Sequence, residues 1–385
     1  MTHKMVPTIL ATASIMALWL GLASAQTLHV LHSFSGANGA YPDGGLVRDS
    51  AGNLYGATPN GGIYKCYLGT HCGNVFRLDV NGKETVLYNF TGGVDGRFPH
   101  AALLRDLAGN LYGTTLRGGS SGHGVVFRLN AGKLTVLHSF TGADGSYPTG
   151  ALLQDSAGNL YGVTVAGGAF GYGVVFRLSA SGNEKVLYSF AGGTDGDQPS
   201  GGLLQDGAGN LYGATEFGGS ARQGAGNGVV FEVDTTGKEI VLHAFSGGAD
   251  GKGPNGDLIR DAAGNLYGTA YEGGSGNGVV FKLSATGHLK VLHTFRGPDG
   301  ALPAAGLIRD AAGNFYGTTT VGGSASNGTI FKLDTDDEET VLHSFKGSDG
   351  ALPFSKLAQD TAGNLYGTTQ LGGTGGVGTV FQLVP

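Results

Sequence analysis

Aspartate recurs in one setting along this chain, followed each time by glycine and separated from the next copy by 49 to 57 residues. The positions are Asn38, which begins the series, then Asp95, Asp144, Asp195, Asp250, Asp299 and Asp349. Carboxylates that converge on one point can hold calcium or the hydroxyl groups of a sugar. An Asp-Gly pair also forms a tight turn in which the aspartate bonds to its own backbone. Because a residue present in every copy of a repeat is usually structural, we expect turns, and we keep a ring of ligand-binding carboxylates, with calcium as the candidate ion, as the alternative.

Aromatic side chains that depart from the repeat are the second set of candidates. They are Tyr41, Phe98 and Tyr147 before prolines, Tyr64, Tyr67, Phe170 and Tyr172 in glycine-rich loops, and, with them, Arg222 in the long loop of the fourth copy. Aromatic rings beside hydrogen-bonding groups can form a surface for a sugar or a peptide. The alternative is ordinary loop variation. We name both sets as ligand-binding candidates, and we assign no catalytic residue and no metal ligand.

Five histidines also recur, and tyrosines take their place in two copies. They are His32, His138, His243, His293 and His343, with Tyr88 and Tyr188 as the replacements. They fall on the strand expected at the outside of each copy, so they diverge and cannot meet at one metal ion. We expect them to pack. The one nucleophile-elbow pattern, at residues 118–122, lies in a glycine-rich loop without the strand-turn-helix that makes its serine reactive. It gives no support for an enzyme, so a non-catalytic protein is favoured and an enzyme is kept as the alternative.

Two cysteines, Cys66 and Cys72, lie six positions apart in the longest loop of the first copy. In an exported protein such a pair predicts a disulfide. A metal site would need two further ligands, and only His71 is at hand.

The unit that must position these residues is marked by Gly-Asn-Leu-Tyr-Gly at residues 52–56, which returns in seven copies. In the third copy, residues 150–155, 160–165, 174–178 and 185–190 are short apolar runs separated by turn residues. Four short antiparallel strands every fifty or so residues, without helical periodicity, are typical of propeller blades. A parallel β-helix is the rival, but its coils are shorter and need no pair of tight hairpins.

The two ends of the chain complete the pattern. Residues 28–34 match the fourth strand of a copy and residues 380–383 match the third. We therefore predict an all-β, seven-bladed β-propeller of four-stranded blades, closed by the N-terminal strand joining the C-terminal blade.

Residues 1–25 have the layout of a secretory signal, with Lys4 before an apolar run and Ala-Ser-Ala before Gln26. A retained membrane anchor is the weaker reading, since the apolar run is short. We expect one propeller domain over residues 26–385, exported to the periplasm or outside the cell, monomeric and without a membrane span. Charged residues make up 14% of the chain and the net charge is −6, which argues against a nucleic-acid partner.

The motifs carry a family resemblance. Val-Leu-His-Ser-Phe, then Gly-Ala-Asp-Gly and Pro148, then Asp155 to Gly162, a Gly-Gly loop and Val-Val-Phe-Arg-Leu resemble the Gloeo/Verruco ("GloVer") tandem repeat of exported bacterial proteins, the choice-of-anchor group. The Asp-x-x-Gly-Asn-Leu-Tyr segment is more distantly similar to NHL-type and lactonase-type propellers. The resemblance implies an exported bacterial propeller and assigns no activity to named residues.

These observations favour a non-catalytic exported protein that binds a ligand, glycan or protein through its loop-rich face, without a cofactor. One alternative is an exported hydrolase, lyase or lactonase with a carboxylate-lined central pocket, for which an off-axis cluster of Asp and His would be evidence. The other alternative is a structural module of the cell surface.

Overall fold

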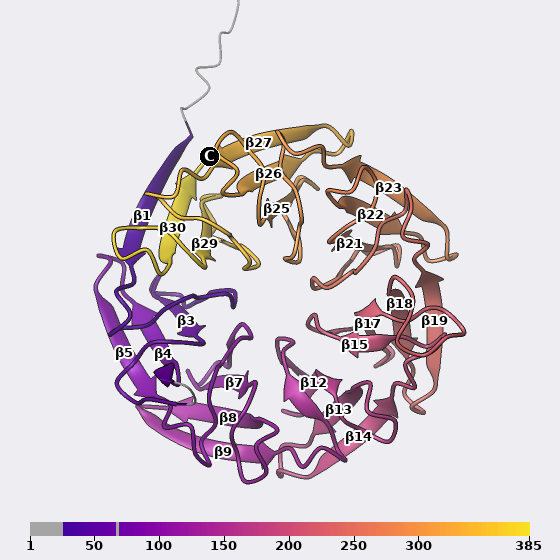
Figure 1. The fold of residues 1–385 in the computed structure, drawn as a ribbon, viewed down its shortest axis with the longest axis horizontal. Coiled ribbons are helices and arrows are strands. Elements are labelled where there is room, and N and C mark those ends of the chain that lie inside the picture. The colour runs from indigo at the N-terminus through magenta and orange to yellow at the C-terminus, as the bar shows by residue number, and fades with distance from the viewer. Residues whose placement is uncertain (1–25, 67–68) are drawn as a thin grey trace, which may run out of the picture.

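The computed structural model describes residues 26–66 and 69–385, which form seven antiparallel sheets arranged as blades around one axis (Figure 1). The described residues contain strands and no α-helix. The expected seven-bladed β-propeller is confirmed. The expected signal peptide, residues 1–25, lies outside the described residues.

Each blade has four strands, numbered here from the axis outward. The innermost strands are β2 (Val47–Arg48), β6 (Leu104–Arg105), β11 (Leu153–Gln154), β16 (Leu204–Gln205), β20 (Ile259–Arg260), β24 (Ile308–Arg309) and β28 (Ala358–Gln359). The second strands are β3 (Leu54–Thr58), β7 (Leu111–Thr115), β12 (Leu160–Ala166), β17 (Leu211–Phe217), β21 (Leu266–Ala270), β25 (Phe315–Thr319) and β29 (Leu365–Thr369).

The third strands are β4 (Asn74–Leu78), β8 (Val125–Asn130), β13 (Val174–Leu178), β18 (Val229–Val233), β22 (Val279–Leu283), β26 (Thr329–Leu333) and β30 (Thr379–Val384). The outermost strands are β5 (Glu84–Asn89), β9 (Lys133–Ser139), β14 (Glu184–Ser189), β19 (Glu239–Ala244), β23 (Leu289–Thr294), β27 (Glu339–Ser344) and β1 (Thr27–Ser33). Two blades gain a further short strand, β10 (Ser146–Pro148) or β15 (Asp197–Pro199), on the second strand.

The ring closes where β1 pairs antiparallel with β30, in the register Leu28 to Leu383 and Ser33 to Thr379. The first residues of the described chain therefore form the outer strand of the last blade, as the sequence predicts. We number the blades 1 to 7 along the chain, so that blade 1 holds β2 to β5 and blade 7 holds β28 to β30 with β1.

The recurring Asp-x-x-Gly-Asn-Leu-Tyr segment makes the hairpin between the first two strands of each blade. In blade 3, Asp155 accepts hydrogen bonds from the Asn159 backbone N–H (2.9 Å), the Asn159 side-chain amide (2.7 Å) and the Tyr161 hydroxyl (3.0 Å). Gly158 has φ of +81°, a conformation that glycine adopts without strain. One carboxylate thus fixes the turn and the start of the second strand.

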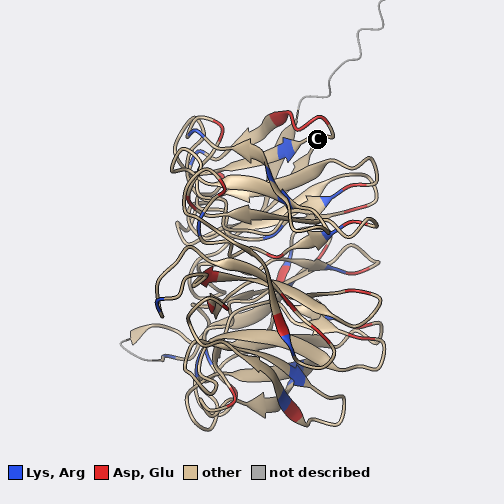
Figure 2. Ribbon diagram, turned by 90° about the vertical axis from the view of Figure 1, so that its right-hand side faces the viewer, with Lys and Arg blue, Asp and Glu red and all other residues tan. Residues whose placement is uncertain are grey.

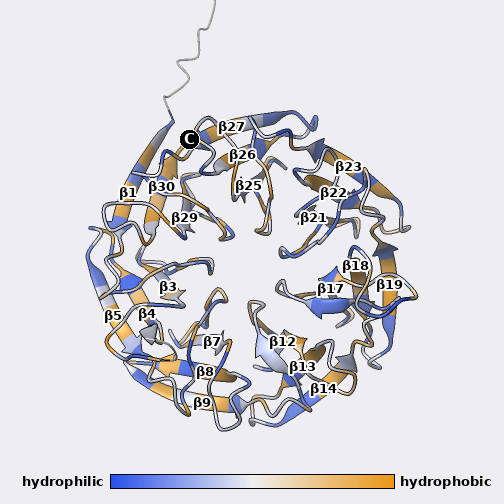
Figure 3. Cartoon of the chain, in the orientation of Figure 1, coloured by the Kyte–Doolittle hydropathy of each residue, from blue (hydrophilic) through white to orange (hydrophobic). Residues whose placement is uncertain are grey.

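Neighbouring blades are joined by phenylalanine pairs in their cores. The phenylalanine after each outermost strand stacks edge-on against the phenylalanine of the next blade's third strand, as Phe140 does on Phe176 (5.1 Å) and Phe345 on Phe381 (5.2 Å). All four rings are fully buried. The outermost strands alternate between hydrophobic and hydrophilic residues along their length (Figure 3), as expected for strands with one face on the core.

The inter-blade loops and the loops between second and third strands leave on one side of the ring, and the short hairpins leave on the other (Figure 2). We call these the loop-rich face and the hairpin face.

The first strand of the third blade is shorter than the sequence predicts. Residues 150–155 are expected to form it in the third copy, but β11 holds only Leu153–Gln154. The segment before it packs against its neighbour at the axis, where a Cβ on Gly150 would lie 2.6 Å from the carbonyl oxygen of Gly201. This segment lines the centre of the ring.

Candidate functional site

Seven such segments, each directly after a proline, surround a cavity of about 110 Å³ at the centre of the ring. The first residue after the proline differs in every blade: Asp43, His100, Thr149, Ser200, Asn255, Ala304 and Phe354. The second residue is always small, and the third is glycine or alanine except at Asp257 and Lys356. The centre of a regular repeat protein is therefore irregular and polar. We call these cavity-lining residues the central ring.

On one side of the central ring, His100 and Asp43 form a pair between the segments that lead into blades 2 and 1, with His100 Nδ1 2.5 Å from Asp43 Oδ2. Burial would lower the pKa of His100, but the charge of Asp43 and its hydrogen bond outweigh burial, so the pKa is raised. The imidazole is held by its Nδ1, an arrangement that fixes its orientation.

On the other side, Asp257 accepts a hydrogen bond from the Gly202 backbone N–H (2.7 Å). It also forms an ion pair with Lys356 (3.2 Å). Lys356 reaches Asp257 past blade 6, whose contribution to the central ring is Ala304, Ala305 and Gly306. The small residues of that blade leave room for this contact. Two acidic and two basic groups therefore face one small space.

Two acceptors in the central ring are buried and have no hydrogen-bond partner among the described residues: Asp43 Oδ1 and Asn255 Oδ1. Buried acceptors cost free energy unless a donor reaches them. Ser200 and Thr149 instead donate, weakly, to the neighbouring backbone carbonyls of Asn255 and Ser200 at 3.4 Å each. The cavity can accept a molecule that offers hydrogen-bond donors.

The recurring inter-blade residues lie elsewhere, at the outer wall. Asp144 accepts from the Thr141 backbone N–H (2.7 Å) and contacts His138 Nε2 of the outermost strand (3.0 Å). The same two contacts, one to the loop backbone and one to the histidine or tyrosine, occur at Asn38, Asp95, Asp195, Asp250, Asp299 and Asp349. These side chains fasten each loop to its own blade and do not encircle the axis. The five histidines are correspondingly spread around the rim.

Three of the aromatic candidates adopt a left-handed backbone, with φ of 58° at Tyr41, 59° at Phe98 and 60° at Tyr147. This conformation is costly for residues other than glycine. Each is followed by a proline and then by a residue of the central ring. Arg97 lies over Phe98 at 5.8 Å and Arg117 over Tyr147 at 4.6 Å. In three consecutive blades an aromatic residue thus lies two positions before a residue of the central ring.

The remaining loop candidates lie further out. Tyr64 and Phe170 are exposed, at 45% and 59% of their surface. Tyr172 is half-buried next to Gly192, and the loop of Arg222 bends over the same place through a Gly224-to-Gly192 backbone bond. Tyr67 lies outside the described residues. Cys66 and Cys72 form the expected disulfide.

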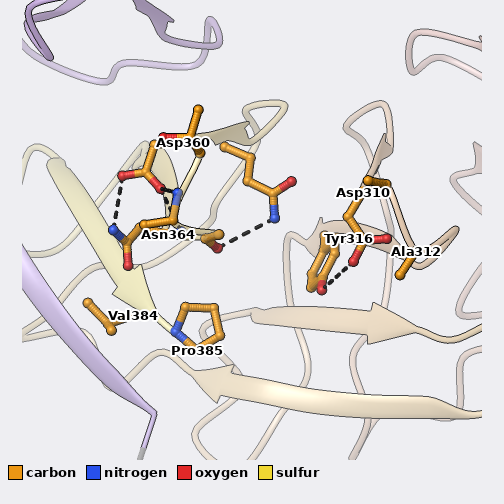
Figure 4. Close-up of a pocket in the computed structure, with 12 residues that line it drawn as sticks. Asp310, Ala312, Tyr316, Asp360, Asn364, Val384 and Pro385 are labelled. Atoms are coloured by element: carbon orange, nitrogen blue, oxygen red, sulfur yellow. Dashed lines mark hydrogen bonds between the residues drawn. The ribbon is translucent and has the colours of Figure 1, made fainter.

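A larger groove of about 550 Å³ lies on the hairpin face between blades 6 and 7, next to the C-terminal Val384 and Pro385 (Figure 4). Its carboxylates are Asp310 and Asp360. Both already accept hydrogen bonds inside their own hairpins, from Tyr316 (3.1 Å) and Asn364 (2.9 Å) among others. The groove therefore offers little unused polar chemistry.

The sequence analysis did not identify a set of polar residues that follow the prolines. It compared the residues that the copies share and the aromatic residues that depart from the repeat, and it did not compare the positions after each proline. The residues it missed are Asp43, His100, Asn255, Asp257 and Lys356. Aligning the seven copies on their prolines would have found them, since this position changes in every copy.

The family model for the Gloeobacter/Verrucomicrobia repeat matches residues 20–225 and 191–381. The chain belongs to this family. The resemblance seen in its motifs is thereby confirmed. No curated protein sequence matches this Gloeobacter/Verrucomicrobia repeat protein.

Among solved structures, the repeat protein is similar to the extracellular domain of BT3049 from B. thetaiotaomicron, assigned as a hybrid two-component system, with 16% identity and a TM-score of 0.57. That match covers 93% of this chain and 41% of the other. The extracellular domain of BT4673 from the same organism matches with 11% identity and a TM-score of 0.60, over 92% of this chain and 39% of the other.

A gluconolactonase from Xanthomonas campestris also matches, with 16% identity and a TM-score of 0.45, over 71% of this chain and 81% of the other. The repeat protein spans about two fifths of the length of the two B. thetaiotaomicron structures. At these identities the two B. thetaiotaomicron matches, with TM-scores of 0.57 and 0.60, show the fold alone. Within the described residues we find no long apolar helix able to cross a bilayer.

Proposed function

We propose that this protein is an exported binding protein that holds a donor-rich, polyhydroxyl ligand at the centre of the ring, on the loop-rich side. The observation that carries the proposal is the irregularity of the central ring: a tandem repeat that is otherwise nearly uniform places its unlike, polar residues together around one cavity. Close packing at the axis does not require different side chains in each blade, since blade 6 packs there with alanine and glycine alone.

The chemistry of the central ring supports this ligand class. Asp43 Oδ1 and Asn255 Oδ1 need donors, and sugar hydroxyls supply them. A cavity of about 110 Å³ holds on the order of three or four water molecules by volume. It therefore suits one polar end of a ligand, and the aromatic residues two positions before the central ring, Tyr41, Phe98 and Tyr147, would contact the rest.

A thermal-shift screen against sugars and cell-wall fragments tests the proposal. A ligand present at a hundred times its dissociation constant adds about 2.7 kcal/mol of stability. We expect a sugar to raise the melting temperature, and Asp43→Ala to remove that response. Asp336→Ala, in an exposed hairpin, serves as the matched control and should leave it intact. A response that survives in Asp43→Ala would exclude the central ring as the site.

The Asp43 and His100 pair favours a second candidate, hydrolysis in the same cavity. A carboxylate that orients an imidazole is the arrangement used to position a general base. This candidate predicts turnover of an ester, lactone or glycoside that is lost in His100→Ala. Binding without turnover across such a panel would contradict it.

Export rests on the signal-like residues 1–25 and is supported by the Cys66 to Cys72 disulfide. Mass spectrometry of protein recovered from the periplasm or the medium should find an N-terminus at Gln26. Recovery of the full-length chain in the cytoplasm would contradict export.

A further inference from the structure

Three side chains meet at the outer wall wherever two blades join. The first is the histidine or tyrosine of the outermost strand, the second is the inter-blade aspartate or asparagine, and the third opens the next blade's outermost strand. In two of the seven places all three can bind a metal ion: His138, Asp144 and Glu184, and His293, Asp299 and Glu339. In each set the ligand atoms all lie within 4.8 Å of one another. We call these two sets the rim triads.

At the corresponding place between blades 7 and 1, an amide group lies between the histidine and the glutamate. There the inter-blade residue is Asn38, whose amide group contacts His32 Nε2 and donates to Glu84 Oε2, both at 2.9 Å. The asparagine nitrogen supplies the positive end of a dipole between a histidine and a carboxylate. In the rim triads an aspartate replaces it and supplies no proton.

The rim triads have no such amide group. Oε1 of Glu184 and Oε1 of Glu339 are buried and have no hydrogen-bond partner among the described residues, and the same is true of Oε1 of Glu84 and Glu239. What distinguishes the rim triads is the set of ligands, because only there do an imidazole and two carboxylates place all three ligand atoms within 4.8 Å of one another among the described residues.

The histidine decides which cation fits. One imidazole nitrogen with two carboxylates suits zinc and related transition metals, whereas calcium prefers oxygen ligands alone. His138 Nε2 already lies 3.0 Å from Asp144 Oδ2, and His293 Nε2 lies 3.0 Å from Asp299 Oδ2.

We propose that each rim triad binds one divalent transition metal ion of the zinc class. The ion would join blade 2 to blade 3 at the first triad, and blade 5 to blade 6 at the second, because the glutamate comes from the following blade. Three protein ligands leave one tetrahedral position for water. The histidines still do not share a metal with one another, as the sequence indicates; each rim histidine instead acts with two carboxylates.

The repeat itself supplies substitutions that fit these places. Leu134, Leu289 and Leu28 stand where the triads have glutamate, as the strand registers show, so Glu184→Leu and Glu339→Leu introduce a side chain that the fold already accepts there. The control is Glu239→Leu, because Glu239 faces Asp195 and Tyr188, which offers no imidazole.

The test is calorimetric titration of the chelator-treated protein with zinc chloride at pH 7.5. We expect two ions per chain in the wild type and in Glu239→Leu, one in either single triad variant, and none at these sites in the double variant. Asp144→Asn, which recreates the Asn38 arrangement, should also remove one ion. Absence of zinc binding in the wild type would overturn the proposal in favour of a shared proton, and binding unchanged in the double variant would overturn it in favour of other ligands.

Discussion

The side-chain nitrogen of Lys356 lies 3.2 Å from Oδ2 of Asp257, although these residues lead into blades 7 and 5, which are not neighbours. The contact passes over the segment of blade 6 and joins the two segments on either side of it. It is possible because blade 6 contributes only alanine and glycine at this level.

We predict that Lys356→Met costs less than about 1 kcal/mol of stability. The two side chains are partly solvated, 38% and 26% exposed, and such ion pairs contribute little. Lys252→Met is the matched control, since Lys252 pairs with Glu272 at 2.7 Å on the surface. Urea unfolding would measure both, and a loss above about 2 kcal/mol for Lys356→Met alone would show that the contact holds the ring together.

Closure of the ring should depend on Phe34. This residue follows β1, is fully buried, and stacks on Phe76 of blade 1 at 5.2 Å. Phe34→Ala should therefore cost about 3–5 kcal/mol. Phe170→Ala, at an exposed ring, should change stability by no more than about 0.5 kcal/mol. Equal melting temperatures for the two variants would argue against closure by the N-terminal strand. Deleting residues 27–34 should be more damaging still and give an insoluble or much less stable protein.

The fold could be predicted from the sequence because its determinants are local and repeated. The hairpin is stabilised by three residues that lie close together in the sequence, Asp155, Asn159 and Tyr161. The phenylalanines that join neighbouring blades recur in the same way in every copy of the repeat. The short β11 could not be predicted, because close packing against Gly201 of the next blade ends its pairing. The central ring depends on seven separate segments meeting at one axis, so no single segment reveals that Asp43 lies next to His100 or that Asp257 lies next to Lys356.

The hairpin aspartates should make the protein sensitive to acid. Burial would raise the pKa of Asp155, but hydrogen bonds from Asn159 and Tyr161 outweigh it, so the pKa is lowered. The same holds at Asp206 and Asp360. A lowered carboxyl pKa stabilises the fold above the unfolded value of about 3.9, and this contribution is lost as pH falls through the folded value. Urea midpoints should drop steeply below about pH 4, and the drop should be shallower in Asp155→Asn.

The outer-wall glutamates should have the opposite effect on the pH dependence of stability, because they favour the folded state at lower pH. Burial, followed by neighbouring aspartates, raises the pKa values of Glu184, Glu239 and Glu339 to about 7. The folded state therefore binds more protons than the unfolded state between about pH 4.5 and 7. In a chelator, stability should decline as pH rises through this window and level off above it. Replacing all three by leucine should flatten the decline. A metal-free wild type with constant stability from pH 4.5 to 7 would contradict this.

The central claim is that the proposed sugar ligand is held by the irregular residues at the axis, whereas the recurring aspartates at the rim take no part in holding it. Calorimetry with the sugar found in the thermal-shift screen tests it most directly, using Asp43→Ala/Asn255→Ala and Asp95→Asn/Asp349→Asn. Removing hydrogen bonds of about 1.5–3 kcal/mol should weaken binding at least tenfold in the first variant and leave the dissociation constant of the second unchanged. Full affinity in the axis variant with loss of binding in the rim variant would contradict the claim.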